Sequence, residues 1–371
     1  MKIHTKLRLG IIGLALIITG QMTIAADNGA TTGRVYVMSN KAHNNSVLVF
    51  QRGANGSLTL AQESFTQGAG TGVTLDPLMS QGALSLCPSG KVLLAVNPAS
   101  GDLTAFRVTA TGLEFGSIVP SGGAFPVSVT CKGGLVYVLN QLGVPNISGF
   151  KVTDSGQLQK IPLSTRDLAG GALALPAQVS FTPDGTQLLV TEKGTNIIDV
   201  FALRPDGRTD GPIVEASSGR TPFGFAFGPS ESVVVTEVEN RLPLKATVSS
   251  YQLAGSTGLE SVSPTIPNQQ SGACWVAITG TTAWVVNTGT ATISAYQVGA
   301  GGNLMLVNAD AAFTGDGTSP IDLAATEDGQ FLYVLKSAIG EIAAYQINGT
   351  SLTPLFTRGG LPLSIQGIAV Q

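Results

Sequence analysis

The sequence predicts an all-β fold, a seven-bladed β-propeller made of four-stranded blades. One sequence pattern recurs along the chain: a β-rich run ends on a polar residue, a short loop follows, and a second run ends on an aromatic residue, as in 135–150 (LVYVLNQLGVPNISGF). The seven closing aromatics lie 44 to 56 residues apart, at Phe50, Phe106, Phe150, Phe201, Tyr251, Tyr296 and Tyr345. A repeat near fifty residues, built from short strands, is typical of a ring of blades that shares one core.

Each repeat divides into four strands joined by turn sequences. In the third repeat the expected strands are residues 126–130, 135–139, 147–152 and 158–161, and Asp154-Ser155-Gly156 forms the last hairpin turn. Glycine suits that turn because it adopts positive φ without steric cost. The abundant glycine (47 residues) and the low content of charged residues (12%) fit many tight turns between buried strands.

The two ends of the chain predict how the ring closes. The first repeat begins with a second-strand run, Val35–Met38, and lacks a first strand, whereas the chain ends with a first-strand run, 366–370. The C-terminal run should therefore complete the N-terminal blade as its innermost strand, which removes open sheet edges. This gives seven blades; the alternative is a miscount caused by one degenerate repeat.

Residues 1–26 read as a secretory signal peptide, followed by a single propeller domain over residues 27–371. Lys2, Lys6 and Arg8 precede an apolar run, and small residues follow at Ala25 and Ala26. The alternative is an uncleaved anchor, although the apolar run is short for a membrane span. We expect a soluble, periplasmic or secreted monomer with no membrane span after cleavage. The slightly acidic net charge (−3), without a basic cluster, argues against nucleic acid as a partner.

Two insertions point to the functional face. Residues 67–80 (QGAGTGVTLDPLMS) and 164–175 (STRDLAGGALAL) are extra sequence between the fourth strand of one blade and the first strand of the next. In a propeller these connections lie on the face where the loops between second and third strands also lie. Loops on a rigid scaffold are the usual place for function.

The same topology names candidate residues for a polar ligand funnel at the channel mouth. Starts of first strands contribute Gln81 and Cys274, and ends of second strands contribute a ring of polar side chains: Asn40, Asn97, Asn140, Glu192, Glu237, Asn287 and Lys336, with Lys193 next to Glu192. The alternative is that these side chains hold loop backbone, which asparagine does well.

The remaining chemistry-bearing residues are few. Cys87 and Cys131 occupy equivalent places in adjacent blades and could pair in an oxidising compartment, but distance decides that. Cys274 is then left over, as a small buried residue or an unpaired thiol. His43 stands alone in a loop, so no zinc-type spacing, nucleophile set, metal site or cofactor motif is predicted.

With the blades laid out, the chain resembles the lactonase-like seven-bladed propellers, the group that contains 6-phosphogluconolactonase and the fungal carboxymuconate cyclase, and the YVTN-type surface repeat proteins. The resemblance covers about residues 33–371 and rests on three segments: 181–194, 236–251 and 287–296. It implies a catalytic His where this chain has Ala177, an Arg-His pair near 221–224, and an Arg near 287–289. None of these is present, and only Glu237 matches the implied set.

Two functional hypotheses follow. In one, an exported propeller binds a small polar molecule, a lactone-like ligand or a partner in the funnel without established catalysis. In the other, it hydrolyses a lactone with Glu237 as general base and Lys193 or Lys336 stabilising charge. Trp-Asp repeat and quinoprotein propellers are disfavoured, because both tryptophans, Trp275 and Trp284, fall in one blade. A polar funnel with its charged groups close together would favour an enzyme, and a plugged channel would favour a scaffold.

Overall fold

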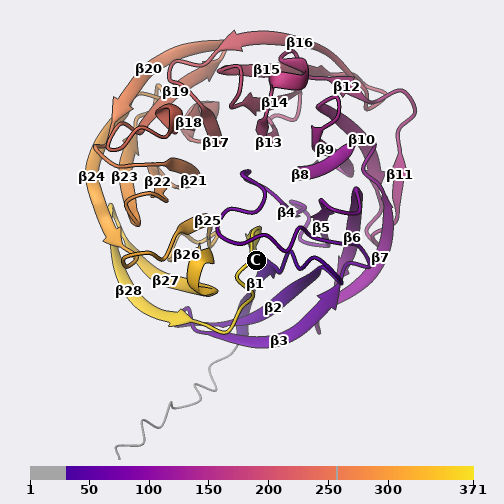
Figure 1. Ribbon diagram of the computed structural model, residues 1–371, viewed down its shortest axis with the longest axis horizontal. Coiled ribbons are helices and arrows are strands. Elements are labelled where there is room, and N and C mark those ends of the chain that lie inside the picture. Colours follow the sequence, from indigo (N-terminus) through magenta and orange to yellow (C-terminus); the bar gives the residue numbers. More distant parts are fainter. Residues whose placement is uncertain (1–30, 256–257) are drawn as a thin grey trace, which may run out of the picture.

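The computed structural model describes residues 31–255 and 258–371, and within them 29 strands form seven antiparallel sheets arranged as a ring (Figure 1). The predicted all-β propeller is confirmed. The predicted signal peptide lies outside the described residues. No helix in the described ranges is long and apolar enough to cross a bilayer.

Each blade runs from an inner strand at the channel to an outer strand at the rim. The strands of the first blade, from the inside outward, are β29 (Ile368–Val370), β1 (Thr31–Met38), β2 (Ser46–Gly53) and β3 (Leu58–Phe65). Those of the second blade are β4 (Leu84–Leu86), β5 (Val92–Asn97), β6 (Asp102–Val108) and β7 (Leu113–Pro120). Those of the third blade are β8 (Ala124–Lys132), β9 (Leu135–Leu142), β10 (Asn146–Val152) and β11 (Leu158–Lys160), and the short strand β12 (Arg166–Asp167) also pairs with β10.

The other four blades repeat this order. They are β13 (Pro176–Phe181), β14 (Gln187–Glu192), β15 (Ile197–Leu203) and β16 (Thr209–Ala216); β17 (Pro222–Phe227), β18 (Val233–Glu237), β19 (Thr247–Leu253) and β20 (Leu259–Pro267); β21 (Ala273–Thr279), β22 (Thr282–Asn287), β23 (Thr292–Val298) and β24 (Leu304–Phe313); and β25 (Pro320–Ala325), β26 (Phe331–Lys336), β27 (Glu341–Asn348) and β28 (Ser351–Arg358). Short 3₁₀ turns are η1 (Gly171–Leu173), η2 (Pro229–Glu231), η3 (Glu239–Arg241) and η4 (Ser337–Ile339).

The ring closes as the two chain ends predict. β29 pairs antiparallel with β1, and Val370 lies opposite Val35 while Ile368 lies opposite Val37. The C-terminal strand is therefore the innermost strand of the N-terminal blade (Figure 1). The first and last parts of the chain are held together by main-chain hydrogen bonds, so β1 is paired on both of its edges.

Burial explains why the second-strand runs are so apolar. Every residue of β5, β14, β22 and β26 is buried, because these strands have neighbouring blades on both faces. A strand covered on both faces loses the alternation of polar and apolar residues. The outer strands, such as β16 and β24, bury only one or two of their residues and expose half or more.

A disulfide joins two adjacent blades. Cys87, which directly follows β4, is bonded to Cys131 of β8, with 5.2 Å between the two Cα atoms. The sequence left this pairing open, and the structure shows it. The bond ties inner parts of neighbouring sheets, which are also joined by a main-chain hydrogen bond from the Val129 N–H to the Gly82 carbonyl (2.8 Å).

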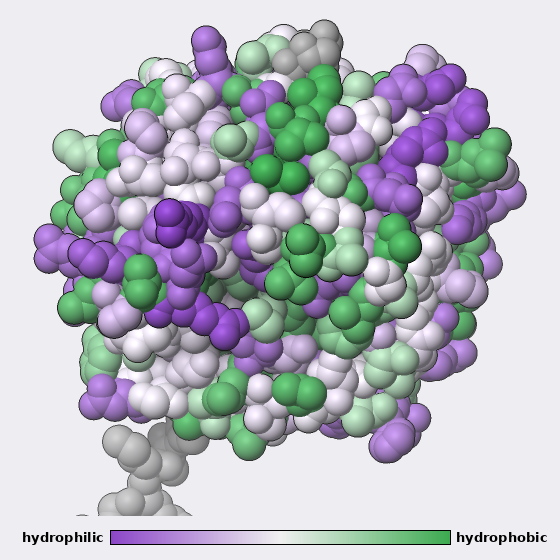
Figure 2. Space-filling view, turned by 45° about the horizontal axis from the view of Figure 1, so that its top comes forward, coloured by the Kyte–Doolittle hydropathy of each residue, from purple (hydrophilic) through white to green (hydrophobic). Residues whose placement is uncertain are grey.

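The surface of the protein carries exposed apolar side chains both at the rim and on the loops. Large exposed apolar side chains lie on outer strands and on loops at the channel mouth, for example Phe313 on β24 and Leu244 after η3. Figure 2 shows the apolar side chains in several separate groups among polar ones rather than in one continuous patch. Scattered exposure of this kind is normal for a protein surface and does not by itself define a docking site.

Candidate functional site

The first insertion closes the centre of the channel mouth. In Figure 1 the purple segment between β3 and β4, which contains residues 67–80 (here the inserted segment), crosses the middle of the ring. The carbonyl of Ser80 accepts hydrogen bonds from Trp275 Nε1 (2.9 Å) and Gln366 Nε2 (2.7 Å), and the N–H of Leu78 donates to Gln366 Oε1 (2.8 Å). The side chain of Gln81 donates a hydrogen bond to the carbonyl of Val276 (2.9 Å) and accepts one from its N–H (3.1 Å). Strand β4 begins three residues later, at Leu84. The segment is thus fastened to several inner strands and forms part of the rigid scaffold.

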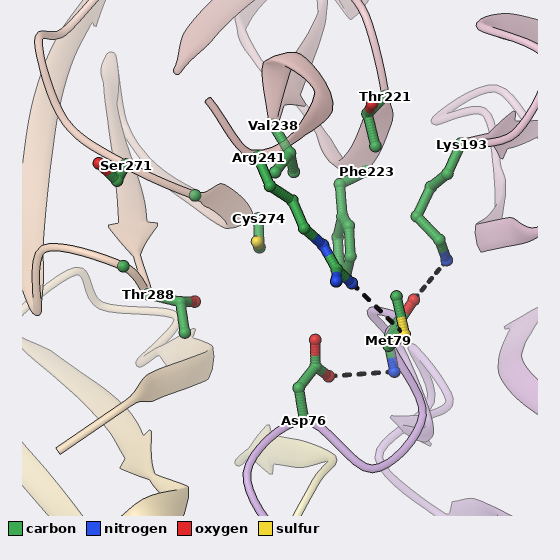
Figure 3. A pocket seen from close by; sticks show the side chains of 12 residues that line it. Asp76, Met79, Lys193, Thr221, Phe223, Val238, Arg241, Ser271, Cys274 and Thr288 are labelled. Atoms are coloured by element: carbon green, nitrogen blue, oxygen red, sulfur yellow. Dashed lines mark hydrogen bonds between the residues drawn. The ribbon is translucent and has the colours of Figure 1, made fainter. Parts of the chain in front are cut away.

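A cavity remains beside the inserted segment. It has a volume of about 320 Å³ and lies between the segment and the loops and inner strands of the blades that begin at β13, β17 and β21. Figure 3 shows the side chains that face it, chiefly Asp76, Met79, Lys193, Phe223, Arg241 and Cys274. A cavity of this size accommodates a small molecule.

Lys193 follows β14 and reaches into the mouth as a buried cation. Its Nζ donates hydrogen bonds to the carbonyls of Met79 (2.5 Å) and Pro176 (3.0 Å) and lies 5.0 Å from the centre of the Phe223 ring. Burial lowers the pKa of Lys193 to about 7, although the negative charge of Asp76 acts in the opposite direction. The side chain of Lys193 therefore changes between its charged and its neutral form near neutral pH.

Asp76 is the acidic member of the cavity and comes from the inserted segment. One carboxylate oxygen, Oδ1, accepts the N–H of Met79 (3.0 Å), and Figure 3 shows the other oxygen pointing away from the segment into the cavity. Burial raises the pKa of Asp76 to about 6, while Lys193 and the Met79 N–H act to lower it.

Arg241, at the end of η3, supplies a second cation. Its side chain is exposed, and its guanidinium extends into the cavity toward Met79 (Figure 3), where Nη2 lies 3.8 Å from the sulfur. Among the described residues neither Arg241 nor Lys193 forms an ion pair with a carboxylate. Two cations that share a cavity with only one carboxyl of the described residues, Asp76, and make no direct ion pair with it are suited to an anionic ligand.

Cys274, in β21, lies in the cavity wall with a free thiol. Burial raises the pKa of this thiol strongly, and the charge of Asp76 adds to the effect. Because the thiolate is the nucleophilic form, Cys274 is an inert wall residue at neutral pH. Over the described ranges, no group of three or more His, Cys, Asp or Glu residues is arranged to hold a metal ion.

Glu237 and Glu192, at the ends of β18 and β14, are enclosed by loop backbone. Glu237 accepts hydrogen bonds from the Gly219 N–H (3.0 Å) and Thr247 Oγ1 (2.6 Å), and a side chain at Gly219 would overlap its carboxylate. Burial raises the pKa of Glu237. Glu192 accepts the Gly170 N–H (3.2 Å) and is fully buried. Neither glutamate lines the cavity.

The predicted ring of asparagines holds loops. Asn40 makes two hydrogen bonds to Thr71 of the inserted segment, through its own Nδ2 (2.8 Å) and Oδ1 (3.1 Å). The other three asparagines bond side chains of neighbouring loops and strands: Asn97 with Asn45 and Thr104, Asn140 with Ser121 and Asn146, and Asn287 with Asn268 and Ser294. Lys336 is paired with Glu341 at 2.6 Å.

Of the residues predicted for the site, the structure thus brings Lys193 and Cys274 to the cavity, with Gln81 at the foot of the inserted segment. A role in ligand binding for Asn40, Asn97, Asn140, Glu192, Asn287 and Lys336, and a catalytic role for Glu237, stay predictions. Sequence reasoning missed Asp76, Phe223 and Arg241. For Asp76 a signal was available, because it is the one charged residue of the inserted segment and that segment was placed at the mouth.

Fold and cavity together define a seven-bladed propeller with a plugged channel and a small, mainly cationic cavity at its mouth. The chain belongs to the lactonase family of seven-bladed β-propellers, whose model matches residues 174–359. No curated protein matches the chain significantly.

Several solved structures share the fold. One is a putative 6-phosphogluconolactonase from Bacteroides fragilis, with 18% identity, a TM-score of 0.72, and 93% of this chain and 100% of that chain covered. Another is the periplasmic gluconolactonase PpgL of Pseudomonas aeruginosa, with 17% identity, a TM-score of 0.73, and 91% and 98% covered. A putative 6-phosphogluconolactonase from Bacteroides uniformis has 17% identity, a TM-score of 0.69, and 90% and 99% covered. At these sequence identities the similarity shows a shared fold only, so the chemistry of this chain must be argued from its own site.

Proposed function

We propose that this protein binds a small, polar, negatively charged or strongly polarised ligand, such as a sugar acid or its lactone, in the cavity beside the inserted segment. The observation that carries the proposal is the pair of cations, Lys193 and Arg241, that reach one cavity and make no direct ion pair among the described residues. A carboxylate or a lactone carbonyl placed between them would receive charge-assisted hydrogen bonds.

The shape of the cavity supports a small ligand. Its volume of about 320 Å³ suits one sugar-sized molecule, and the inserted segment prevents a longer chain from passing down the channel. Phe223, whose ring packs edge-on against Trp275 at a centroid distance of 4.9 Å, offers an apolar wall for the carbon skeleton. The names of the structural neighbours, which include a gluconolactonase, agree with this size and chemistry.

Calorimetric titration of the mature protein with gluconate tests the proposal. We expect binding that is weakened about tenfold or more by Arg241→Gln, since a hydrogen bond to a charged group contributes about 1.5–3 kcal/mol. Arg358→Gln, at an exposed arginine on β28 that does not line the cavity, is the matched control and should bind as the wild type does. Equal affinity of the two variants, or no binding by the wild type, contradicts the proposal.

The same titration has a predicted pH dependence. Lys193 is cationic below its pKa of about 7, and Asp76 gains negative charge above its pKa of about 6. Raising the pH from 6 to 8 therefore makes the cavity less positive through both groups. Gluconate should bind more weakly at pH 8 than at pH 6, and stronger binding at pH 8 would refute this electrostatic account.

Lactone hydrolysis is the second candidate, and membership of the lactonase family favours it. With Glu237 as general base, Glu237→Gln should abolish turnover of sugar and aliphatic lactones. Turnover that survives in this variant would keep the enzyme and remove Glu237 from the mechanism. No turnover by the wild type on any lactone would leave binding as the function.

Export to the periplasm or the medium is a further part of the proposal. The disulfide between Cys87 and Cys131 supports it, because such bonds persist in oxidising compartments. Fractionation of cells that express the full chain should place a shortened protein outside the cytoplasm. A full-length protein confined to the cytoplasm would contradict it. We also propose that the protein acts as a monomer, which light scattering of the purified protein would test.

A further inference from the structure

We propose that Asp76, carried by the inserted segment, is the general base of a lactone hydrolysis in this cavity, and that Arg241 stabilises the oxyanion. This inference rests on the proposed function, because it takes the cavity as the place where a lactone binds. It goes beyond that function by assigning the chemistry to a residue that lies outside the repeating blades.

The position of Asp76 is set by a short turn. Oδ1 is held by the N–H of Met79 three residues later, so the carboxylate has one fixed oxygen and one that faces the cavity (Figure 3). The segment that carries it is in turn fixed by Gln366 and Trp275. A general base needs this kind of defined orientation, with one oxygen free for a water molecule.

The groups that face Asp76 set its charge. They are the cations Lys193 and Arg241, the neutral thiol of Cys274, and the buried carboxyl of Asp322. Burial raises the pKa of Asp76; the two cations, the Met79 N–H and a hydrogen bond with the Gln366 side chain oppose that rise, which leaves a value of about 6. A carboxylate that ionises close to neutral pH is a better proton acceptor than an ordinary surface aspartate and is still largely ionised at pH 7.

The reaction balances with water as the only co-substrate. The oxygen of a water molecule attacks the lactone carbonyl carbon while Asp76 takes one of its protons, and the carbonyl oxygen becomes an oxyanion beside the Arg241 guanidinium. The bond between the carbonyl carbon and the ring oxygen then breaks, and Asp76 returns the proton to that oxygen. The product is a hydroxy acid, which releases its carboxyl proton to solvent; its carboxylate is held by the same guanidinium, and Asp76 is again ionised.

The alternative groups at the mouth are less suited to this role. Glu237 is enclosed by the Gly219 loop and Thr247 and does not line the cavity. Both carboxylate oxygens of Asp322 accept main-chain N–H groups, from Leu323 and Gly367, at 3.1 Å. Asp76 is the carboxylate in the described cavity lining with an oxygen turned toward the space.

The test measures turnover and binding separately. Hydrolysis of glucono-δ-lactone and δ-valerolactone is followed by titration of the released acid from pH 5 to 7, with the uncatalysed rate subtracted. The wild-type rate should rise with pH and reach half its plateau near pH 6. Asp76→Asn retains an oxygen for the Met79 N–H and removes a negative charge, so it should melt no lower than wild type and bind gluconate at least as tightly, yet lose about 100-fold or more in kcat.

Asp316→Asn is the matched control, because Asp316 is an exposed aspartate in the loop before β25 and does not line the cavity. Its kcat and pH profile should equal those of the wild type. Gluconate binding without turnover of either lactone would overturn the inference and leave the proposed function intact, whereas absence of binding would remove both. An Asp76→Asn variant with undiminished kcat overturns the inference. A wild-type rate that does not change between pH 5 and pH 7 also overturns it, and this measurement needs no variant.

Discussion

The buried pair Asp199 and Glu192 makes the stability of the protein depend on pH, and Asp199→Asn is the perturbation that isolates this effect. Asp199 lies on β15 with no exposed surface, and its Oδ2 accepts the N–H of Ala169 (2.9 Å) in the second insertion. Burial and the adjacent Glu192 carboxyl together raise the pKa of Asp199 to about 8, against the opposing effect of the Ala169 N–H. Oδ1 has no hydrogen-bond donor among the described residues, so it is the atom that a proton would occupy.

The sign and size of the effect follow from proton linkage. An unfolded aspartate titrates near pH 3.8, so between that pH and about 8 the folded state holds a proton that the unfolded state releases. The free energy of unfolding then falls as the pH rises, by at most about 1.4 kcal/mol per pH unit for this one group. Two units, from pH 5 to pH 7, amount to about 3 kcal/mol.

That free energy converts to a measurable shift in melting temperature. In a domain of about 340 residues the unfolding entropy is on the order of 0.7 kcal/mol per degree, so 3 kcal/mol corresponds to about 4 °C. Asparagine does not titrate, and it keeps an oxygen for the Ala169 N–H. The other buried carboxyls and Lys193 titrate in both proteins and cancel in the comparison.

Melting curves of both proteins at pH 5, 6 and 7 check the reasoning. Between pH 5 and pH 7 the melting temperature of Asp199→Asn should rise by about 4 °C relative to that of wild type. Asp199→Ala is the control, because it loses the hydrogen bond to Ala169 and should be less stable than wild type at pH 5. A difference between Asp199→Asn and wild type that does not change with pH would refute the linkage argument.

Three further predictions concern the ring. Deletion of Gln366–Gln371 removes β29 and two hydrogen bonds to the inserted segment, so the melting temperature should fall by well over 2 °C; a smaller change would contradict the closure. Tyr333→Phe removes a buried hydrogen bond of 2.7 Å to the main chain of the neighbouring blade and should cost about 1 kcal/mol. Tyr345→Phe, whose hydroxyl makes no hydrogen bond to a described residue, should cost less in the same melts. Replacing Cys87 and Cys131 by serine opens a loop with a sequence separation of 44 and should cost about 4 kcal/mol in denaturant unfolding, and unchanged stability would show that the bond does not form in the protein.

The fold could be predicted because its signals are local and repeated. Seven second-strand runs, each covered on both faces, produce the same apolar pattern wherever they occur, and the incomplete first and last repeats fit only one closed arrangement. The turn at Asp154-Ser155-Gly156 has Gly156 at a φ of 78°, as its sequence suggested. Repetition allowed each blade to support the assignment of the next.

The site could be predicted only in part, because its decisive residues lie outside the repeat. Lys193 and Cys274 were found from their equivalent places at strand ends and starts. Asp76 is in an insertion whose path across the channel depends on contacts with Gln366 and Trp275, about 190 to 290 residues away along the chain. Periodicity carries no information about such a path. For the ring of asparagines the sequence allowed both ligand binding and loop support, and only the hydrogen-bond partners show that loops use them.

The inserted segment also gives a physical reason for the departures from the set that the family resemblance implies. Ala177 stands where a histidine was implied; it is fully buried, and its carbonyl accepts the N–H of Gln81 directly after the segment. Phe223, in the stretch where an Arg-His pair was implied, forms a wall of the cavity and contacts the Lys193 ammonium. Apolar residues at these two positions suit a mouth that the segment fills, and the segment brings its own carboxylate to the space that remains. In the mechanism proposed above the chemistry uses Asp76 and Arg241, so the loss of turnover in Asp76→Asn separates an enzyme rebuilt around the insertion from a propeller that only binds.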